Sequence, residues 1–339
     1  MRSSGVAGQC CLLQGRLLQA RLKQCRVLRS TAFLLALVVC GSNVGLLHAG
    51  EAGLENPVPD RDFPPLHVDI LRKGDSSQDA LKTAIERLPA SELTADQIAT
   101  VRGVLENRSL FRQLPTLAVE AAPAVHSYFV GNPEAAVGIW QVLEISQFEL
   151  KKTEPVVWFG DAGDGSEGTI EVLHRGAGSV LLHCDGEYKS PLLPRPIRAT
   201  SIMHLRVQPK KADDGKTLLV QDLDLFVTFP SQTVDTVARL ISPVSHLIAD
   251  RNFRELTLFV RFMQVAMERQ PGWVERTVQR IEGIDRKQRE ELLNVSARVF
   301  VDGRKRELSG EGIQQAGLEK ILAPYQQDQP TVRAQQGGM

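Results

Sequence analysis

Residues 148–229 alternate apolar and polar side chains in short runs, and turn sequences rich in glycine and proline separate these runs. An alternation with a period of two is typical of β-strands that are buried on one face. Gly176-Ala177-Gly178 and Asp214-Gly215 lie between successive runs and predict hairpin turns. Successive hairpins indicate an antiparallel meander, with strands at 156–159, 169–174, 180–188, 200–208 and 217–229.

After residue 229 the apolar period becomes helical, and residues 252–269 form the longest uninterrupted amphipathic stretch. Apolar residues recur there at spacings of three and four, and further apolar residues widen the stripe. The stripe consists of Phe253, Leu256, Val260, Met263 and Met267, widened by Leu258, Phe259, Phe262 and Val265. A stripe of this width predicts a helix that is buried on most sides. We therefore predict an α+β fold in which a curved antiparallel sheet packs on a long C-terminal helix.

Shorter helical patterns precede and follow the sheet. Ser77 and Thr94 are N-cap residues of two short helices, and Gln97 completes a capping box with Thr94. Asn132-Pro133 starts another helix, and Pro243 predicts a break in the apolar segment 234–249. The predicted organisation is a signal peptide or N-terminal anchor (1–49), a linker (50–75), a small helical preamble (76–130), the α+β domain (131–270), C-terminal helices (271–322) and a disordered tail (323–339).

The order of elements across residues 132–269, a helix followed by a meander and a long apolar helix, resembles the helix-grip or START-like architecture. In that family the sheet wraps around the last helix, and the gap between them holds hydrophobic ligands. The resemblance implies a site for an apolar ligand or lipid. The candidate ligand-binding residues are Phe259, Phe262, Met263 and Met267, because methionine adapts to irregular ligands. Ordinary core packing is the alternative use of the same stripe.

A second candidate site lies on the predicted sheet. Strand residues alternate between faces, so His183 and Asp185 share one face, as do Asp222 and Asp224. With His204 on a strand between them, a suitable register would gather two histidines and several carboxylates on one surface. Such a cluster suits metal binding or acid–base chemistry. The alternative is the polar outer face of an ordinary antiparallel sheet. No motif in the chain identifies a cofactor.

The N-terminal fifty residues have the layout of an export signal. Six basic residues and no acidic residue precede Glu51, and an apolar run covers 32–40. This run is shorter than the about 20 apolar residues that span a bilayer. Small residues near Gly41 and Ala49 offer cleavage sites, and lipidation at Cys40 or an uncleaved anchor formed by 31–49 are the alternatives. The sequence thus predicts an exported protein of the periplasm or cell envelope, tethered to the inner membrane if the segment stays.

The charge of the remaining chain argues against nucleic acid as a partner. Of the 40 basic and 40 acidic residues, 34 basic and all 40 acidic residues follow residue 50, a net charge of −6. Binding to phosphates requires a basic face, which such a balance does not favour. Cys184 is the only cysteine beyond residue 40, so the exported part has no intramolecular disulfide.

Short phrases such as Asn132-Pro133-Glu134 and Pro194-Arg195-Pro196 are similar to those of uncharacterised exported proteins of planctomycete bacteria. Residues 109–115 and 139–140 extend the likeness. This resemblance implies a bacterial, exported protein and no particular activity. Three functions stay open: a non-enzymatic binding module for an apolar ligand or lipid, a structural or interaction protein of the cell envelope, and a metal-dependent enzyme. We favour the first, because of the strand-then-helix order and the wide Phe/Met stripe.

Overall fold

The computed structural model describes residues 64, 66–189, 195–212, 215–230, 243–310, 317 and 319–322. The predictions for residues 1–49, 234–242 and 323–339, and for most of the linker 50–75, concern residues outside this set. None of the described helices is long and apolar enough to cross a membrane.

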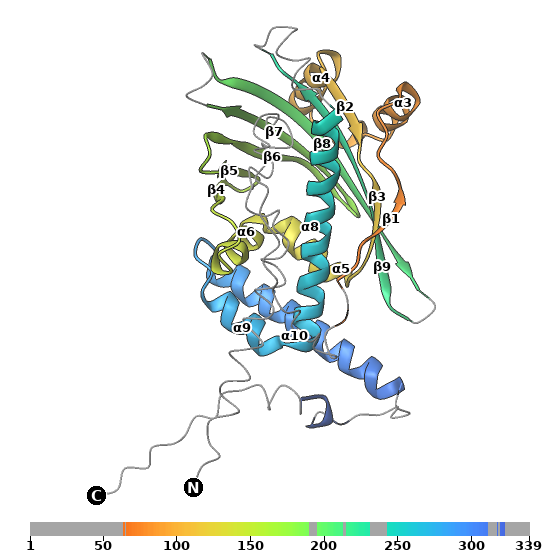
Figure 1. Ribbon diagram of the computed structural model, residues 1–339, viewed down its shortest axis with the longest axis vertical. Helices are drawn as coiled ribbons and strands as arrows, with labels where there is room; N and C mark the ends of the chain where they lie inside the picture. The colour runs from red at the N-terminus through yellow and green to blue at the C-terminus, as the bar shows by residue number, and fades with distance from the viewer. Residues whose placement is uncertain are drawn as a thin grey trace, which may run out of the picture.

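A single curved antiparallel sheet of nine strands dominates the described part of the chain (Figure 1). The main path runs β1-β3-β9-β8-β7-β6-β5-β4, and β2 pairs with β9 beside β3. The strands are β1 Asp69–Arg72, β2 Leu110–Gln113, β3 Thr116–Glu120, β4 Glu149–Glu154, β5 Val157–Asp161, β6 Ser166–Gly176, β7 Ser179–Tyr188, β8 Ile197–Lys211 and β9 Thr217–Thr228. The predicted antiparallel meander is confirmed, because β4 to β9 pair in sequence order.

The hairpin between β6 and β7 shows how the sequence specifies this meander. Gly178 has a φ of 77°, a left-handed conformation that favours glycine. A Cβ at this position would lie 2.5 Å from the Val207 carbonyl oxygen on β8. The turn therefore needs glycine both for its backbone conformation and for the close approach of the neighbouring strand.

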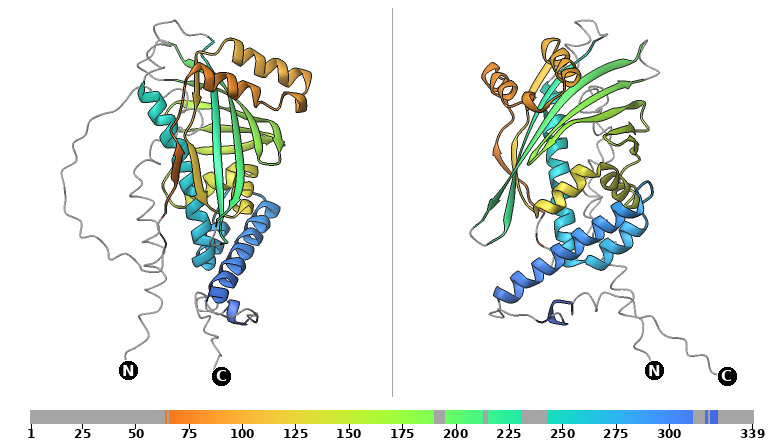
Figure 2. Two further views of the ribbon diagram at one scale, coloured as in Figure 1. Left: turned by 90° about the vertical axis from the view of Figure 1, so that its right-hand side faces the viewer. Right: turned by 180° about the vertical axis from the view of Figure 1, so that it is seen from behind.

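Helices cover both faces of the sheet, as the two views of Figure 2 show. One face carries α3 (Gln78–Glu86) and α4 (Ala95–Glu106), while α8 (Pro243–Arg269) crosses the other. Four further helices, α5 (Pro123–Gly131), α6 (Pro133–Val142), α9 (Pro271–Gln279) and α10 (Arg286–Gly310), pack on the α8 side, and the 3-10 helix η1 (Ala90–Glu92) links α3 to α4. The larger hydrophobic core lies under α8, and a smaller core lies under α3 and α4.

The predicted helix caps are present at the start of α3 and α4. The Ser77 hydroxyl accepts from the Ala80 N–H, and Thr94 and Gln97 form the reciprocal capping box. The long helix differs from its prediction, because α8 begins at Pro243 and continues without a break through residue 252. Proline is tolerated in the first turn of a helix, where its missing N–H costs no hydrogen bond.

Four strands, β1 to β4, lie where no strand was predicted. β1 falls in the predicted linker, and β2 and β3 fall in the segment predicted to be a helical preamble. β3 lies between β1 and β9, and its residues 116–119 are all buried. A short strand buried on both faces has no apolar–polar alternation, which is why the pattern did not reveal it. The same segment contains α5, which the prediction also lacked, and β4 is the fourth of these strands.

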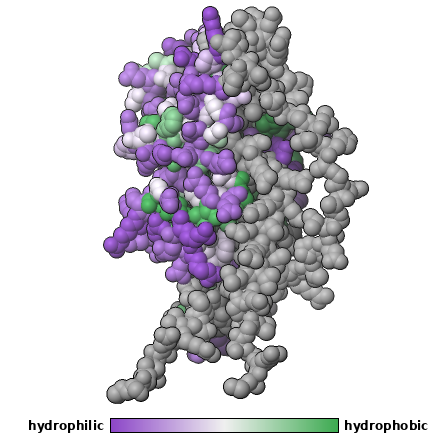
Figure 3. Space-filling model, turned by 60° about the vertical axis from the view of Figure 1, so that its left-hand side comes forward, coloured by the Kyte–Doolittle hydropathy of each residue, from purple (hydrophilic) through white to green (hydrophobic). Residues whose placement is uncertain are grey.

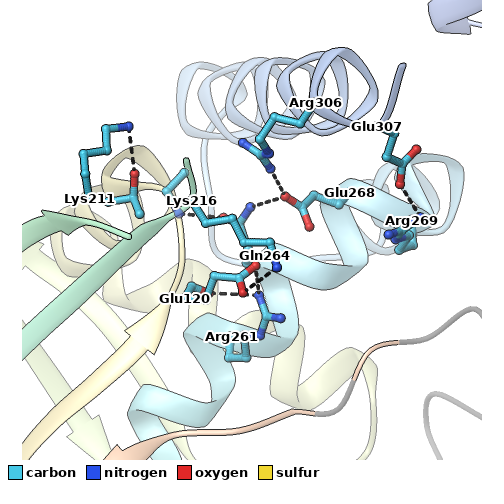
Figure 4. A network of polar contacts seen from close by, with 11 residues as sticks. Glu120, Lys211, Lys216, Arg261, Gln264, Glu268, Arg269, Arg306 and Glu307 are labelled. Carbon is cyan, nitrogen blue, oxygen red and sulfur yellow. Dashed lines mark hydrogen bonds and ion pairs between the residues drawn. The ribbon is translucent and has the colours of Figure 1, made fainter. Parts of the chain in front are cut away.

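Polar contacts fix α8 over the sheet near its C-terminal half (Figure 4). The buried Arg261 guanidinium donates to both the carbonyl and the carboxylate of Glu120 at the end of β3, at 3.0 and 3.1 Å. Gln264 accepts from the Ala122 N–H at 2.8 Å, and Glu268 accepts from Arg306 of α10 at 2.6 Å. At the other end of α8, Asp250 pairs with Arg112 of β2 at 2.5 Å. These contacts hold α8 against β2, against the end of β3 and against α10.

Candidate functional site

A cavity of about 200 Å³ lies between the sheet and α8, at the place where the helix-grip resemblance implies one. Its lining is almost wholly apolar and comes from α5, α6, α8 and the strands β4 to β9. The outer surface is different: the described residues visible in Figure 3 are mainly hydrophilic, with small hydrophobic areas between them. The apolar lining of this cavity therefore contrasts with the mainly hydrophilic described surface seen in that view.

Aromatic side chains form the helical wall of this cavity. The Phe259 ring of α8 lies edge-to-face against Phe129 of α5, with ring centroids 5.1 Å apart, and against Trp140 of α6 at 5.5 Å. Phe253 and Val260, on the same side of α8, continue this wall. Edge-to-face ring pairs stabilise a protein by more than the burial of their apolar area, so these contacts fix the shape of the wall.

Alternating strand residues form the opposite wall. Val172 of β6 pairs with Leu182 of β7, and Val180 of β7 pairs with Leu205 of β8. Directly paired residues lie on the same face of a sheet, so these four side chains form one continuous apolar surface. All four line the cavity.

Two polar side chains, His126 of α5 and Gln221 of β9, interrupt the apolar lining. Both are buried, with 7% and 3% exposed surface. Burial lowers the pKa of His126 to about 4, and a hydrogen bond with Gln221 opposes this shift only partly. The imidazole is therefore neutral near pH 7. The Gln221 Nε2 is buried and has no hydrogen-bond partner among the described residues.

A second hollow, of about 240 Å³, adjoins this cavity and shares His126, Val130, Val180 and Leu205 with it. It is more polar and includes the exposed Arg175, whose Nη2 donates to the Val130 carbonyl at 3.2 Å. His126 thus stands at the junction between an apolar chamber and a polar one.

The structure separates the four residues predicted to bind an apolar ligand. Phe259 lines the cavity, but Phe262, Met263 and Met267 do not. These three are fully buried in the core, where the Phe262 ring packs edge-to-face on Trp273 of α9 at 5.7 Å. Helical periodicity marks buried positions, and it does not distinguish the wall of a cavity from close-packed core.

The five residues predicted as a metal cluster do share one face of the sheet, but the register separates them. His204 pairs with Asp224, whereas His183 pairs with Ile202 and Asp185 with Thr200. The His183 Nδ1 lies 3.7 Å from the Glu171 carboxylate, and Asp185 accepts from Thr200 at 3.1 Å. Among the described residues no group of three histidine, cysteine or acidic side chains could hold a metal ion.

The remaining members of this set belong to a hydrogen-bonded network under α3. Arg206 donates to Asp224 at 2.6 Å, and Gln113 donates to the other oxygen of Asp224 at 3.0 Å. Thr116 donates to Asp222 at 2.6 Å. Asp224 is completely buried, so these donors are needed to offset the loss of its hydration. The outer face of the sheet is therefore covered around His204 and Asp224, whereas Asp185 farther along β7 is exposed.

One contact in this network resembles a nucleophile–base pair, because the Ser179 hydroxyl lies 2.9 Å from the His204 Nε2. The other ring nitrogen, Nδ1, lies 3.1 Å from the Arg206 Nη1, which can only donate. Nδ1 is then the acceptor, so the proton of neutral His204 is on Nε2 and points at Ser179. Burial and Arg206 also lower the pKa of His204 to about 4. Nε2 thus offers no lone pair to accept the serine proton.

His126 and Gln221 were missed as functional candidates. The signal for Gln221 was present in the sequence, because residues 219, 221, 223, 225 and 227 face inward along β9 and Gln221 is the one polar residue among them. No comparable signal marks His126, since α5 itself was not predicted.

Comparison with protein-family models gives no match for this chain, and comparison with curated proteins gives none either.

Proposed function

We propose that this protein binds a small, largely apolar molecule in the cavity between the sheet and α8, and that it does so without catalysing a reaction. The observation that carries the proposal is the cavity itself, about 200 Å³ in volume and lined by apolar side chains from six strands and three helices.

Energetics favour an occupant. A closed, empty cavity costs about 24 cal/mol for each Å³, so the upper bound for one of this size is roughly 5 kcal/mol. That cost is comparable to the whole stability of many domains, roughly 5–15 kcal/mol. Water does not recover it, because an apolar cavity provides too few hydrogen-bond partners and stays dry.

The volume sets the size of the ligand. A cavity of about 150 Å³ holds the six carbons of benzene, so this cavity, which adjoins the second hollow, has room for roughly eight or nine carbons. A full lipid chain would extend beyond it into the adjoining hollow. We therefore favour a compact hydrophobic molecule, or the end of a longer chain.

A binding role suits the chemistry of the lining better than catalysis. The described lining contains one titratable side chain, His126, and its neutral imidazole has no carboxylate or hydroxyl partner in the lining. General acid–base or nucleophilic catalysis needs at least such a pair. A structural role in the cell envelope stays the second candidate, and it predicts no ligand.

The sequence adds a place of action to this proposal. The basic N-terminus and the apolar run at 32–40 support export to the periplasm or cell envelope of a bacterium. The intact mass of the protein in its own host tests this: loss of about 40–50 residues supports cleavage, whereas an unprocessed chain in the cytoplasm contradicts export.

Calorimetric titration with isopropylbenzene, which has nine carbons, tests binding directly. We expect saturable binding by the unmodified protein and at least tenfold weaker binding by Ala136→Leu, because leucine adds three carbons to a residue that lines the cavity. The matched control is Met263→Leu, a volume-conserving change at a buried residue outside the lining, which should bind as tightly as the unmodified protein. Absence of saturable binding, or equal binding by both variants, would refute the proposal.

A further inference from the structure

Among the inward-facing residues 219–227 of β9, Gln221 is the polar one, and its surroundings indicate what the cavity binds. Gln221 pairs with Leu117 of β3 and Val207 of β8, so apolar residues flank it in its own row of the sheet. Its neighbours along the strand on the same face are Leu219 and Leu223. A glutamine placed in such a surrounding loses its hydration and needs hydrogen bonds in return.

Only part of this need is met by the protein. The Gln221 side chain interacts with the His126 imidazole and favours its protonated form, which opposes part of the effect of burial on the pKa of His126. The amide nitrogen remains, and it is buried without a partner among the described residues. Buried donors in folded proteins are paired in the large majority of cases, so an unpaired one needs an explanation.

We infer that the ligand is a neutral molecule with an oxygen acceptor, such as a ketone, ester or alcohol, and that Gln221 Nε2 donates a hydrogen bond to this oxygen. The inference rests on the proposed function and deepens it. The hydrocarbon part of the ligand would fill the apolar chamber, with its oxygen at the end formed by Gln221 and His126.

The charge of the lining selects a neutral oxygen over a carboxylate. The described lining contains no lysine or arginine, and His126 is uncharged near neutral pH. A carboxylate moved into this chamber would lose its hydration with no cation to compensate. Arg175, in the adjoining hollow, does not line the chamber and is occupied with the Val130 carbonyl.

Three probes of nearly equal size test this inference: isopropylbenzene with no oxygen, acetophenone with one neutral carbonyl, and benzoate with a carboxylate. Each is titrated calorimetrically into the unmodified protein and into Gln221→Leu, which removes the donor and keeps most of the side-chain volume. We expect Gln221→Leu to weaken acetophenone relative to isopropylbenzene by about fivefold or more, the usual contribution of one hydrogen bond. Benzoate should bind the unmodified protein more weakly than acetophenone at pH 7.

The outcomes separate this inference from the proposed function. If no probe binds, the proposed function fails and this inference fails with it. If isopropylbenzene binds and its ratio to acetophenone is the same in both proteins, the cavity binds ligands but the Gln221 assignment is wrong. Tighter binding of benzoate than of acetophenone would also overturn it. Thermal melts show whether Gln221→Leu is folded, and Gln221→Met provides a second, unbranched replacement.

Discussion

Acid should destabilise this protein in a defined pH range, because two buried histidines are neutral in the folded state. Burial lowers the pKa of His126 from 6.5 to about 4, and burial together with Arg206 lowers the pKa of His204 from 6.5 to about 4. In the unfolded chain both rings take up a proton near pH 6.5. Protonation therefore favours unfolding as the pH falls below 6.5, and the effect is complete near pH 4.

The magnitude follows from the two shifts. One pKa unit corresponds to about 1.36 kcal/mol, so each histidine should lower the free energy of unfolding by roughly 3 kcal/mol between pH 7 and pH 4. His126 lies under α8 and His204 lies on the opposite face of the sheet, so the two effects should add. Together they amount to roughly 6 kcal/mol, which is comparable to the total stability of many domains.

Urea unfolding at several pH values between 7 and 4 measures this effect. His126→Gln and His204→Gln remove the titrating rings, and each should reduce the loss of stability across this range by roughly 3 kcal/mol, whatever the variant's stability at pH 7. His67→Gln is the matched control, because His67 lies at the surface with 72% of its side chain exposed, and this variant should retain the full loss. Equal losses of stability between pH 7 and pH 4 in the unmodified protein and all three variants would refute the reasoning.

Other substitutions test the packing and the turns. Phe259→Ala should destabilise the protein by about 3–5 kcal/mol in urea unfolding, whereas Leu247→Ala at an exposed position of the same helix should change stability by less than about 0.5 kcal/mol; similar effects would show that Phe259 is not packed as described. Gly178→Ala should lower the melting temperature more than Gly215→Ala, since both have positive φ but only Gly178 has a neighbouring carbonyl within contact distance. A larger decrease in melting temperature for Gly215→Ala would contradict the described geometry of the β6–β7 turn. Asp224→Ala should cost about 3–5 kcal/mol, because it removes the carboxylate that pairs with the Arg206 guanidinium, whose side chain is only 16% exposed; a loss below about 1 kcal/mol in urea unfolding would argue against the network.

The sequence predicted those parts of the fold that local patterns encode. Half-buried strands with polar outer faces, such as β6 and β7, alternate clearly, and their connecting glycines mark the turn. The capping box at Thr94 is likewise local, since both of its partners lie within four residues. The sequence of β3 has no such local pattern. The segments that bury it, β1, β9 and the surrounding helices, come together only when the chain folds.

The candidate site was predicted only in outline. The wide stripe of α8 indicated burial, and the cavity lies against that helix, but Phe262 and Met263 pack in the core while Phe129 and Trp140 complete the aromatic wall. Which buried side chains border a space depends on contacts between segments far apart in the chain. The outer-face histidines show the same limit, since alternation grouped residues within each strand but could not give the register between strands, which pairs His183 with Ile202 and not with His204.

The coverage of the sheet by helices on both faces has a consequence for hydrogen exchange. Amides in the middle of β8 and β9 are bonded to strands on either side and are shielded by α8 below and α3 and α4 above. Such amides exchange with solvent only when the whole domain unfolds, whereas the edge strands β1 and β4 exchange through local opening. A ligand that binds in the cavity of the folded protein makes global unfolding rarer, so saturation with such a ligand should slow the exchange of these central amides.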